Sequence, residues 1–220
     1  VIVPLALLSY FNYVEAKRYF ESELLLRTSK LISNARRTLF YFIEERRLMT
    51  DFVVKNHDFR ELTHEKRLKR ILANLQSSYP GLVDIGIIDA SGVQIAYAGP
   101  YQLVGRNYGQ QPWFSEVVQK GFYISDVALG YRNVPHFSMA FKHPNPHLSF
   151  YVVRVSVDTT SFDKILSAIE LTETGEIFLI NRQGVLQSAS NSYAKTLQKI
   201  PVAVPPYSDS SQVFQAASAT

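Results

Sequence analysis

The stretch YPGLVDIGIIDASGVQIAYAGP, residues 79–100, decides the fold. Residues 83–88 and 93–98 are apolar and rich in β-branched side chains, as is typical of strands. Between them, DASG at 89–92 has the composition of a tight turn. The Pro-Gly pair at 80–81 is a stop signal for a preceding helix. The stretch therefore predicts a β-hairpin that begins directly behind a helix.

The residues before this hairpin are predicted to be helical. No Gly or Pro occurs from residue 5 to residue 79, and apolar residues recur at steps of three or four up to about residue 54. A helix of about 40 residues is roughly 60 Å long. Its apolar stripe is wide, which favours a spine on which a domain packs over a two-stranded coiled coil. A second helix is predicted over residues 63–78.

The elements after the hairpin alternate between strand and helix patterns. They are a short helix at 112–119, strands at 123–129, 137–143 and 150–157, and a helix from 158–160 to about 171. The sequence therefore predicts an α+β fold, in which a long N-terminal helix packs on an antiparallel sheet domain.

An internal similarity follows the first set of strands. IDASGV at 88–93 has a counterpart in INRQGV at 180–185, and both lie between apolar segments. The similarity indicates the start of a second domain like the first. A chance match is the alternative, because such hairpins are common. The tail from residue 201 is rich in Pro and Ser, so we expect this second domain to be incomplete here.

Charge and composition exclude several classes of protein. The net charge is +4, with 14 basic and 9 acidic residues (+5) at 15–70 and 9 basic and 10 acidic residues (−1) at 71–220. The charges at 15–70 alternate in sign, as on a solvated helix, so no nucleic-acid partner is predicted. The absence of cysteine excludes disulfides and thiolate zinc sites.

The N-terminal segment resembles the edge of a membrane span. Residues 1–13 carry no charge, and Tyr10 and Tyr13 are followed by Lys17 and Arg18. A signal-peptide core is the alternative, but no small-residue cleavage site follows. We therefore expect 1–13 to be the end of a transmembrane helix in a longer protein.

No catalytic motif is found in the sequence. His143 and His147 are separated by two prolines, which preclude the helix on which two histidines four apart bind one metal readily, so a loop is favoured. We therefore predict no catalytic site, no metal site and no cofactor in these 220 residues.

Three motifs resemble the double Cache (dCache) extracytoplasmic sensor family of bacterial transmembrane receptors, and most closely its histidine-kinase-type members. They are the stretch at 79–100, NYGQQPWFSEVV at 107–118 and GFYISDVALGYRNVPHFSMAFK at 121–142. The resemblance implies PAS-like lobes behind a long helix. The implied division is 1–13 for the transmembrane end, 14–56 for the spine helix, 57–160 for the membrane-distal ligand-binding lobe, and 161–220 for a linker helix and a partial second lobe.

The resemblance also implies a function. The segment would be the small-molecule sensing module of a receptor in the bacterial inner membrane, exposed to the periplasm or the outside of the cell, and most simply part of a sensor histidine kinase. The alternatives are a chemoreceptor, a diguanylate cyclase, or a membrane-anchored scaffold that binds protein and has no small ligand. The expected partners are a small ligand such as an organic acid or amine, the membrane, and a second copy through the long helix.

The family places its pocket in the distal lobe, which implies a set of ligand contacts. Gln111 stands where amino-acid-binding members have an Arg, so amino-acid specificity is not implied. The implied contacts are Trp113, Phe114, Tyr123, Asp126, Arg132, His136, Phe137 and Asp158.

The roles of the charged residues at 121–137 can also be inferred without the family resemblance. Because side chains alternate along a strand, Tyr123 and Asp126 face opposite sides unless a bulge or a strand end intervenes. An Asp among apolar residues needs a partner. Arg132 or a ligand is a candidate partner: Asp126 suits an ammonium group and Arg132 a carboxylate. A purely structural Asp126–Arg132 pair is the alternative.

Overall fold

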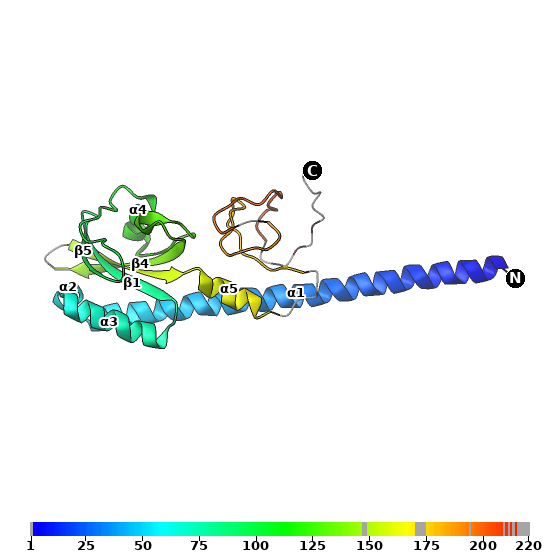
Figure 1. The fold of residues 1–220 in the computed structure, drawn as a ribbon, viewed down its shortest axis with the longest axis horizontal. Coiled ribbons are helices and arrows are strands. Elements are labelled where there is room, and N and C mark those ends of the chain that lie inside the picture. Colours follow the sequence, from blue (N-terminus) through cyan, green and yellow to red (C-terminus); the bar gives the residue numbers. More distant parts are fainter. Residues whose placement is uncertain are drawn as a thin grey trace.

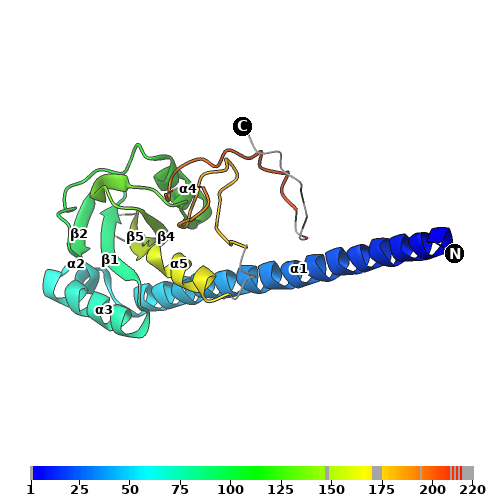
Figure 2. The ribbon, with the colours of Figure 1, turned by 45° about the vertical axis from the view of Figure 1, so that its right-hand side comes forward.

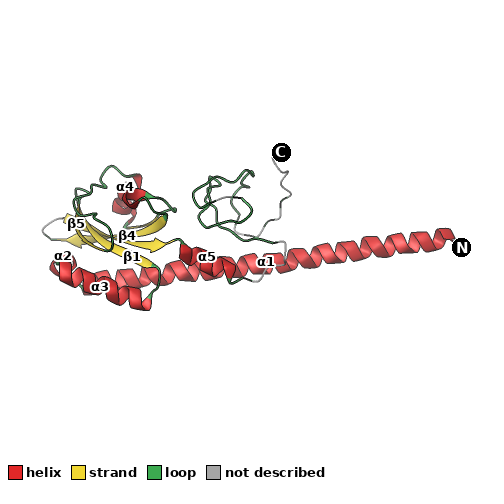
Figure 3. Cartoon of the chain, viewed as in Figure 1, coloured by secondary structure: helices red, strands yellow, loops and turns green. Residues whose placement is uncertain are grey.

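The computed structural model describes residues 2–146, 149–169, 175–193, 195–208, 210, 212 and 214. It confirms the α+β class: a long helix carries a five-stranded antiparallel sheet (Figures 1 and 3). The helices are α1 (Ile2–Asn56), α2 (Phe59–Thr63), α3 (Glu65–Ser78), α4 (Pro112–Lys120) and α5 (Thr160–Ser167), with a short 3₁₀ helix η1 (Gly130–Arg132). The strands are β1 (Leu82–Asp89), β2 (Gln94–Ala98), β3 (Phe122–Ile124), β4 (His136–Asn145) and β5 (Ser149–Asp158).

Helix α1 is the spine that the sequence predicts. Its 55 residues correspond to about 80 Å of helix, and its N-terminal half extends well beyond the sheet in both ribbon views (Figures 1 and 2). Among the residues that the structure describes, no helix has an apolar stretch long enough to cross a bilayer. The role of residues 1–13 as the end of a membrane span therefore stays a prediction.

The sheet has the strand order β2-β1-β5-β4-β3, and every neighbouring pair is antiparallel. Because side chains alternate, each strand contributes to two faces. One face packs on α1, α3 and α5 and forms the main core. Its buried side chains include Ile85, Ile87, Phe137, Met139, Phe141, Val153, Val155 and Val157.

The opposite face of the sheet is covered in part by α4. A smaller core lies there, with Ile88 and Val152 from the sheet and Phe114 and Val117 from α4. Pro112 occupies the first turn of α4, where its missing N–H costs nothing. Gly121 ends the helix in the left-handed conformation (φ 80°), which glycine adopts without strain.

The two similar sequence motifs form the same turn. The Asp89 carboxylate accepts hydrogen bonds from the N–H groups of Ser91 (2.9 Å) and Val93 (3.0 Å). The Asn181 side-chain oxygen accepts from Gln183 (3.0 Å) and Val185 (2.9 Å) in the same way. In the described part of 175–208 no strand forms, and only isolated bridges such as Ile180–Leu186 are present. The division of the chain into domains stays a prediction.

Three element boundaries differ from those predicted. The strand predicted at 123–129 ends at Ile124, because Asp126 and Val127 together stand opposite Phe137, between the Ser125–Ser138 hydrogen bond and the Ala128–His136 bridge. Strand β4 continues to Asn145 through the predicted loop, and Pro144 lies opposite Phe150. Helix α5 ends at Ser167, short of 171, which falls outside the described residues.

Candidate ligand-binding site

A cavity of about 270 Å³ lies over the sheet face that α4 partly covers. Strands β3, β4 and β5 form its floor, and the segments around α4 and η1 form its walls. Its lining is mainly aromatic and small polar side chains, the composition of small-molecule pockets. The lining residues are Tyr108, Gln111, Trp113, Tyr123, Ser125, Ala128, Gly130, Tyr131, His136, Ser138, Ala140 and Arg154.

Strand alternation explains how the floor is built. Ser138 and Ala140 occupy alternate positions on β4, and Ala140 pairs with Arg154 on β5 and with Tyr123 on β3. On its other side, Arg154 pairs with Gly86 of β1. The two residues beside Arg154 in the sheet are therefore small. The Gln94 side chain fills the space over Gly86, whereas the small side chain of Ala140 leaves room for the cavity.

Aromatic rings form the wall of the cavity. Tyr108 makes edge-to-face contacts with Trp113 (centroids 5.4 Å apart) and with Tyr131 (5.2 Å). Tyr108 is buried, and burial raises the pKa of its hydroxyl, so the group stays protonated. Within the described structure this hydroxyl has no hydrogen-bond partner. Because the hydroxyl has almost no accessible surface, Tyr108 contributes its ring to the cavity wall.

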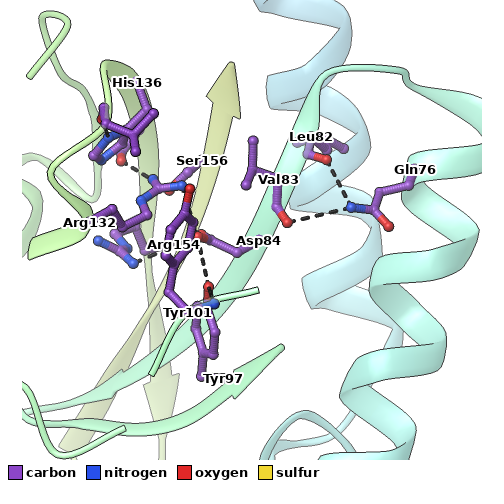
Figure 4. A network of polar contacts seen from close by, with 12 residues as sticks. Gln76, Leu82, Val83, Asp84, Tyr97, Tyr101, Arg132, His136, Arg154 and Ser156 are labelled. Atoms are coloured by element: carbon purple, nitrogen blue, oxygen red, sulfur yellow. Dashed lines mark hydrogen bonds and ion pairs between the residues drawn. The ribbon is translucent and has the colours of Figure 1, made fainter. Parts of the chain in front are cut away.

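A buried charge cluster lies beside the cavity floor (Figure 4). Asp84 on β1 has no exposed surface; its Oδ2 lies 2.9 Å from Arg132 Nη1 and accepts a hydrogen bond from the Tyr97 hydroxyl at 3.1 Å. Arg154 Nη2 is 3.9 Å from Asp84 Oδ1, too far for a hydrogen bond. Asp84 is the only acidic residue that is buried among those described, so two guanidiniums share one carboxylate.

The cluster affects the ionisation of its neighbours. Burial is the main cause that lowers the pKa of the Arg132 guanidinium from its usual value. Burial, with Asp84 as the second cause, raises the pKa of Tyr97 well above its usual range, so Tyr97 remains a donor. Burial also lowers the pKa of His136 to about 4, and the charges of Arg132 and Arg154 add to this effect. His136 is therefore neutral at neutral pH; its Nδ1 lies 2.8 Å from the Val134 carbonyl.

His136 should make folding stability depend on pH. The unfolded imidazole binds a proton below about pH 6.5, whereas the folded one stays neutral down to about pH 4. The free energy of unfolding is therefore expected to fall by up to about 3 kcal/mol as the pH drops through this window. Chemical denaturation at pH 7 and pH 4.5 checks this, with His136→Gln as the non-titrating control. Equal losses in wild type and variant would show that His136 does not contribute.

The structure brings together three of the predicted contact residues. Trp113, Tyr123 and His136 all line the cavity. Phe114 lies in the small core under α4, and Phe137 lies on the opposite face of the sheet, stacked on Phe162 with centroids 4.8 Å apart. Neither of these two phenylalanines lines the cavity.

The predicted charged contacts take other partners. Arg132 pairs with Asp84 and not with Asp126, for which it was one of two candidate partners, because Arg132 is buried beside β1 while Asp126 is exposed. Asp126 Oδ2 accepts a hydrogen bond from Asn181 Nδ2 at 2.9 Å, which links the first lobe to the turn at 181–185. Asp158 accepts from the Thr160 N–H at 2.9 Å, and it does not line the cavity.

Sequence reasoning missed most of the cavity lining, including Tyr108 and Arg154, and it missed Asp84 in the charge cluster. Two of them carried a signal: Asp84 and Arg154 each interrupt an apolar strand (VDIGI and YVVRVSV). A charged side chain in such a run must be paired or face a polar site. Tyr108 carried no comparable signal.

Comparison with solved structures supports the fold assignment. The Desulfohalobium retbaense extracellular ligand-binding receptor superposes with a TM-score of 0.64 at 16% identity, over 77% of this chain and 32% of that one. The V. cholerae histidine kinase DctB sensor domain gives 0.62 at 13% identity, over 76% and 67% of the two chains. The ligand-binding domain of the Campylobacter jejuni chemoreceptor Tlp3, solved with 4-methylisoleucine, gives 0.54 at 13%, over 77% and 68%.

These similarities define the class of fold. The chain has the fold of the extracellular sensor domains of histidine kinases and chemoreceptors, as the resemblance in sequence predicts. It spans about a third of the length of the Desulfohalobium receptor. No protein-family model and no curated protein matches the sequence.

Proposed function

We propose that this chain is the extracytoplasmic small-molecule sensing module of a transmembrane signal-transduction receptor, most simply a sensor histidine kinase. The cavity over the sheet carries the proposal, because its lining combines an aromatic wall with one charged side chain, that of Arg154. The fold supports it, since proteins of this fold include a histidine kinase sensor domain and a chemoreceptor solved with a bound ligand. Trp113, Tyr123 and His136 would contact the ligand.

The sheet would transmit the signal. Its one face forms the cavity floor, and its other face packs on α1 through residues such as Phe141. A ligand that favours one packing arrangement of the sheet on α1 would shift the helix by about 1–2 Å toward or away from a membrane. Residues 1–13 would continue into that membrane, the bacterial inner membrane, with the rest of the segment outside the cytoplasm.

Helix α1 is also the proposed contact between two copies of the chain. Tyr41, Leu48 and Phe52 recur at helical spacing on α1, and each is more than half exposed. Apolar side chains in such a row are stabilised when a second helix covers them. The proposed homodimer would place two spines side by side.

A thermal-shift screen tests the sensing function. The panel contains organic acids, amines, amino acids and purines. A ligand at 100 times its Kd should raise the free energy of unfolding by about 2.7 kcal/mol. Trp113→Ala removes part of the cavity wall, and Ala140→Leu fills part of the cavity. Each should weaken the apparent affinity at least tenfold and so reduce the rise in Tm. Phe40→Ala, which truncates an exposed aromatic side chain on α1 outside the proposed dimer contact, is the matched control and should respond as wild type does. A ligand shift that survives both cavity variants would place the site elsewhere.

A further inference from the structure

We propose that the ligand of this cavity carries a carboxylate, and that Arg154 is the residue that pairs with it. The inference rests on the proposed function and adds the chemical class of the ligand. It begins from Arg154, a residue with only 5% of its surface exposed that nevertheless lines the cavity. Within the described residues, its Nε and Nη2 have no hydrogen-bond partner.

The neighbouring carboxylate does not satisfy Arg154. Asp84 is held by Arg132 at 2.9 Å and by the Tyr97 hydroxyl at 3.1 Å, whereas Arg154 Nη2 is 3.9 Å away. Two guanidiniums and one carboxylate leave one unit of positive charge in the cluster. A buried charge with unpartnered donors is costly unless an opposite charge reaches it.

Because Arg154 is one of the residues that line the cavity, the cavity is where an opposite charge can approach its guanidinium. The cross-strand neighbours of Arg154 are Gly86 and Ala140. The Gln94 side chain fills the space over Gly86, whereas Ala140 borders the cavity, so the cavity side of Arg154 is the open one. The Arg154 guanidinium carbon lies 4.9 Å from the ring centre of Tyr108, whose buried hydroxyl is also unpartnered. A carboxylate is the anion that suits a guanidinium best, because its two oxygens accept from the planar N–H groups together.

The lining of the cavity favours an anion over a cation. None of its twelve lining residues is Asp or Glu, and Arg154 is the only one that is charged at neutral pH. The sequence-based expectation that Asp126 would hold an ammonium group finds no counterpart here, because Asp126 is exposed and bound to Asn181. The aromatic wall of Tyr108 and Trp113 would contact the apolar part of the ligand.

Removing Arg154 tests the assignment without knowledge of the ligand. If Arg154 is a ligand-binding cation, Arg154→Met relieves an unpaired charge, and the Tm of the ligand-free chain should stay within about 2 °C of wild type or rise. If Arg154 is instead an essential structural partner of Asp84, breaking the pair should lower the Tm by about 6 °C or more. Such a drop would overturn the proposal.

Matched ligand pairs complete the test. The Tm is measured at pH 7.5 with propionate, isovalerate or succinate and with the corresponding amides. Isobutylamine serves as a cationic probe and adenine as a neutral one. At least one carboxylate should raise the Tm of wild type while its amide does not. Arg154→Met should lose this response, and Arg154→Lys should weaken the apparent affinity at least tenfold while keeping the fold, because lysine cannot bind a carboxylate bidentately.

The outcomes separate this inference from the function on which it rests. If amides, isobutylamine or adenine raise the Tm and Trp113→Ala abolishes the effect, the sensing function holds and the carboxylate assignment is wrong. A carboxylate response that persists in both Arg154 variants also overturns the assignment. If no compound of this panel or of the wider screen changes the Tm, both proposals fail.

Discussion

Asp84→Asn is expected to lower the free energy of unfolding by about 3–5 kcal/mol. The substitution keeps the shape of the side chain but removes the only buried negative charge among the described residues. Arg132, with its side chain 2% exposed, and Arg154 would then be two buried cations without a counter-charge. Urea denaturation at pH 7.5 measures the loss.

A matched control separates burial from the loss of any ion pair. Asp51 pairs with Lys55 at 2.6 Å on the surface of α1, so Asp51→Asn should cost less than about 1 kcal/mol. The double variant Asp84→Asn/Arg154→Met should recover part of the loss, because one unpaired cation is removed. Similar small losses for Asp84→Asn and Asp51→Asn would contradict the buried cluster.

Phe137→Ala is expected to cost about 3–5 kcal/mol as well, and to leave ligand affinity unchanged. Phe137 is 1% exposed and stacks on Phe162 of α5 with an interplanar angle of 15°. Truncation would leave a cavity between the sheet and α5, on the face opposite the candidate site. The stability loss is measured by urea denaturation and the affinity by titration of the folded variant.

The control for Phe137 is an exposed phenylalanine. Phe40 on α1 is 59% exposed, so Phe40→Ala should change stability by less than about 1 kcal/mol. If Phe137→Ala weakened ligand binding tenfold without loss of stability, Phe137 would be a ligand contact, as the resemblance in sequence implies, and the two faces of the sheet would be assigned wrongly.

The sequence predicted the fold well because its signals are local. The unbroken apolar periodicity before residue 54 and the turn at 89–92 each depend on residues a few positions apart. The structure bears out the long helix, and the hairpin has the expected turn with Gly92 at φ 88°. The strand predicted at 123–129 was too long, because the irregular pairing at Asp126 and Val127 depends on tertiary contacts, such as the hydrogen bond that the Val127 N–H donates to the Gln187 side chain.

The site was less predictable because its partners are distant in sequence. Arg132 had a near candidate in Asp126, but from η1 it pairs with Asp84 on β1, 48 positions away, a contact that only the tertiary fold creates. The face on which Phe137 lies follows from the register of β4 against β5, which a single sequence does not specify. Trp113, Tyr123 and His136 were found only because the resemblance pointed to this region.

The fluorescence of Trp113 tests directly whether the cavity over the sheet binds a small molecule. Trp113 is the only tryptophan of the chain, and it lines the cavity. A compound that raises the Tm should change the Trp113 fluorescence in a saturable way, with the Kd that the stabilisation implies. A compound that stabilises the protein but leaves this fluorescence unchanged at saturation would contradict binding in the cavity, because its site would then lie elsewhere.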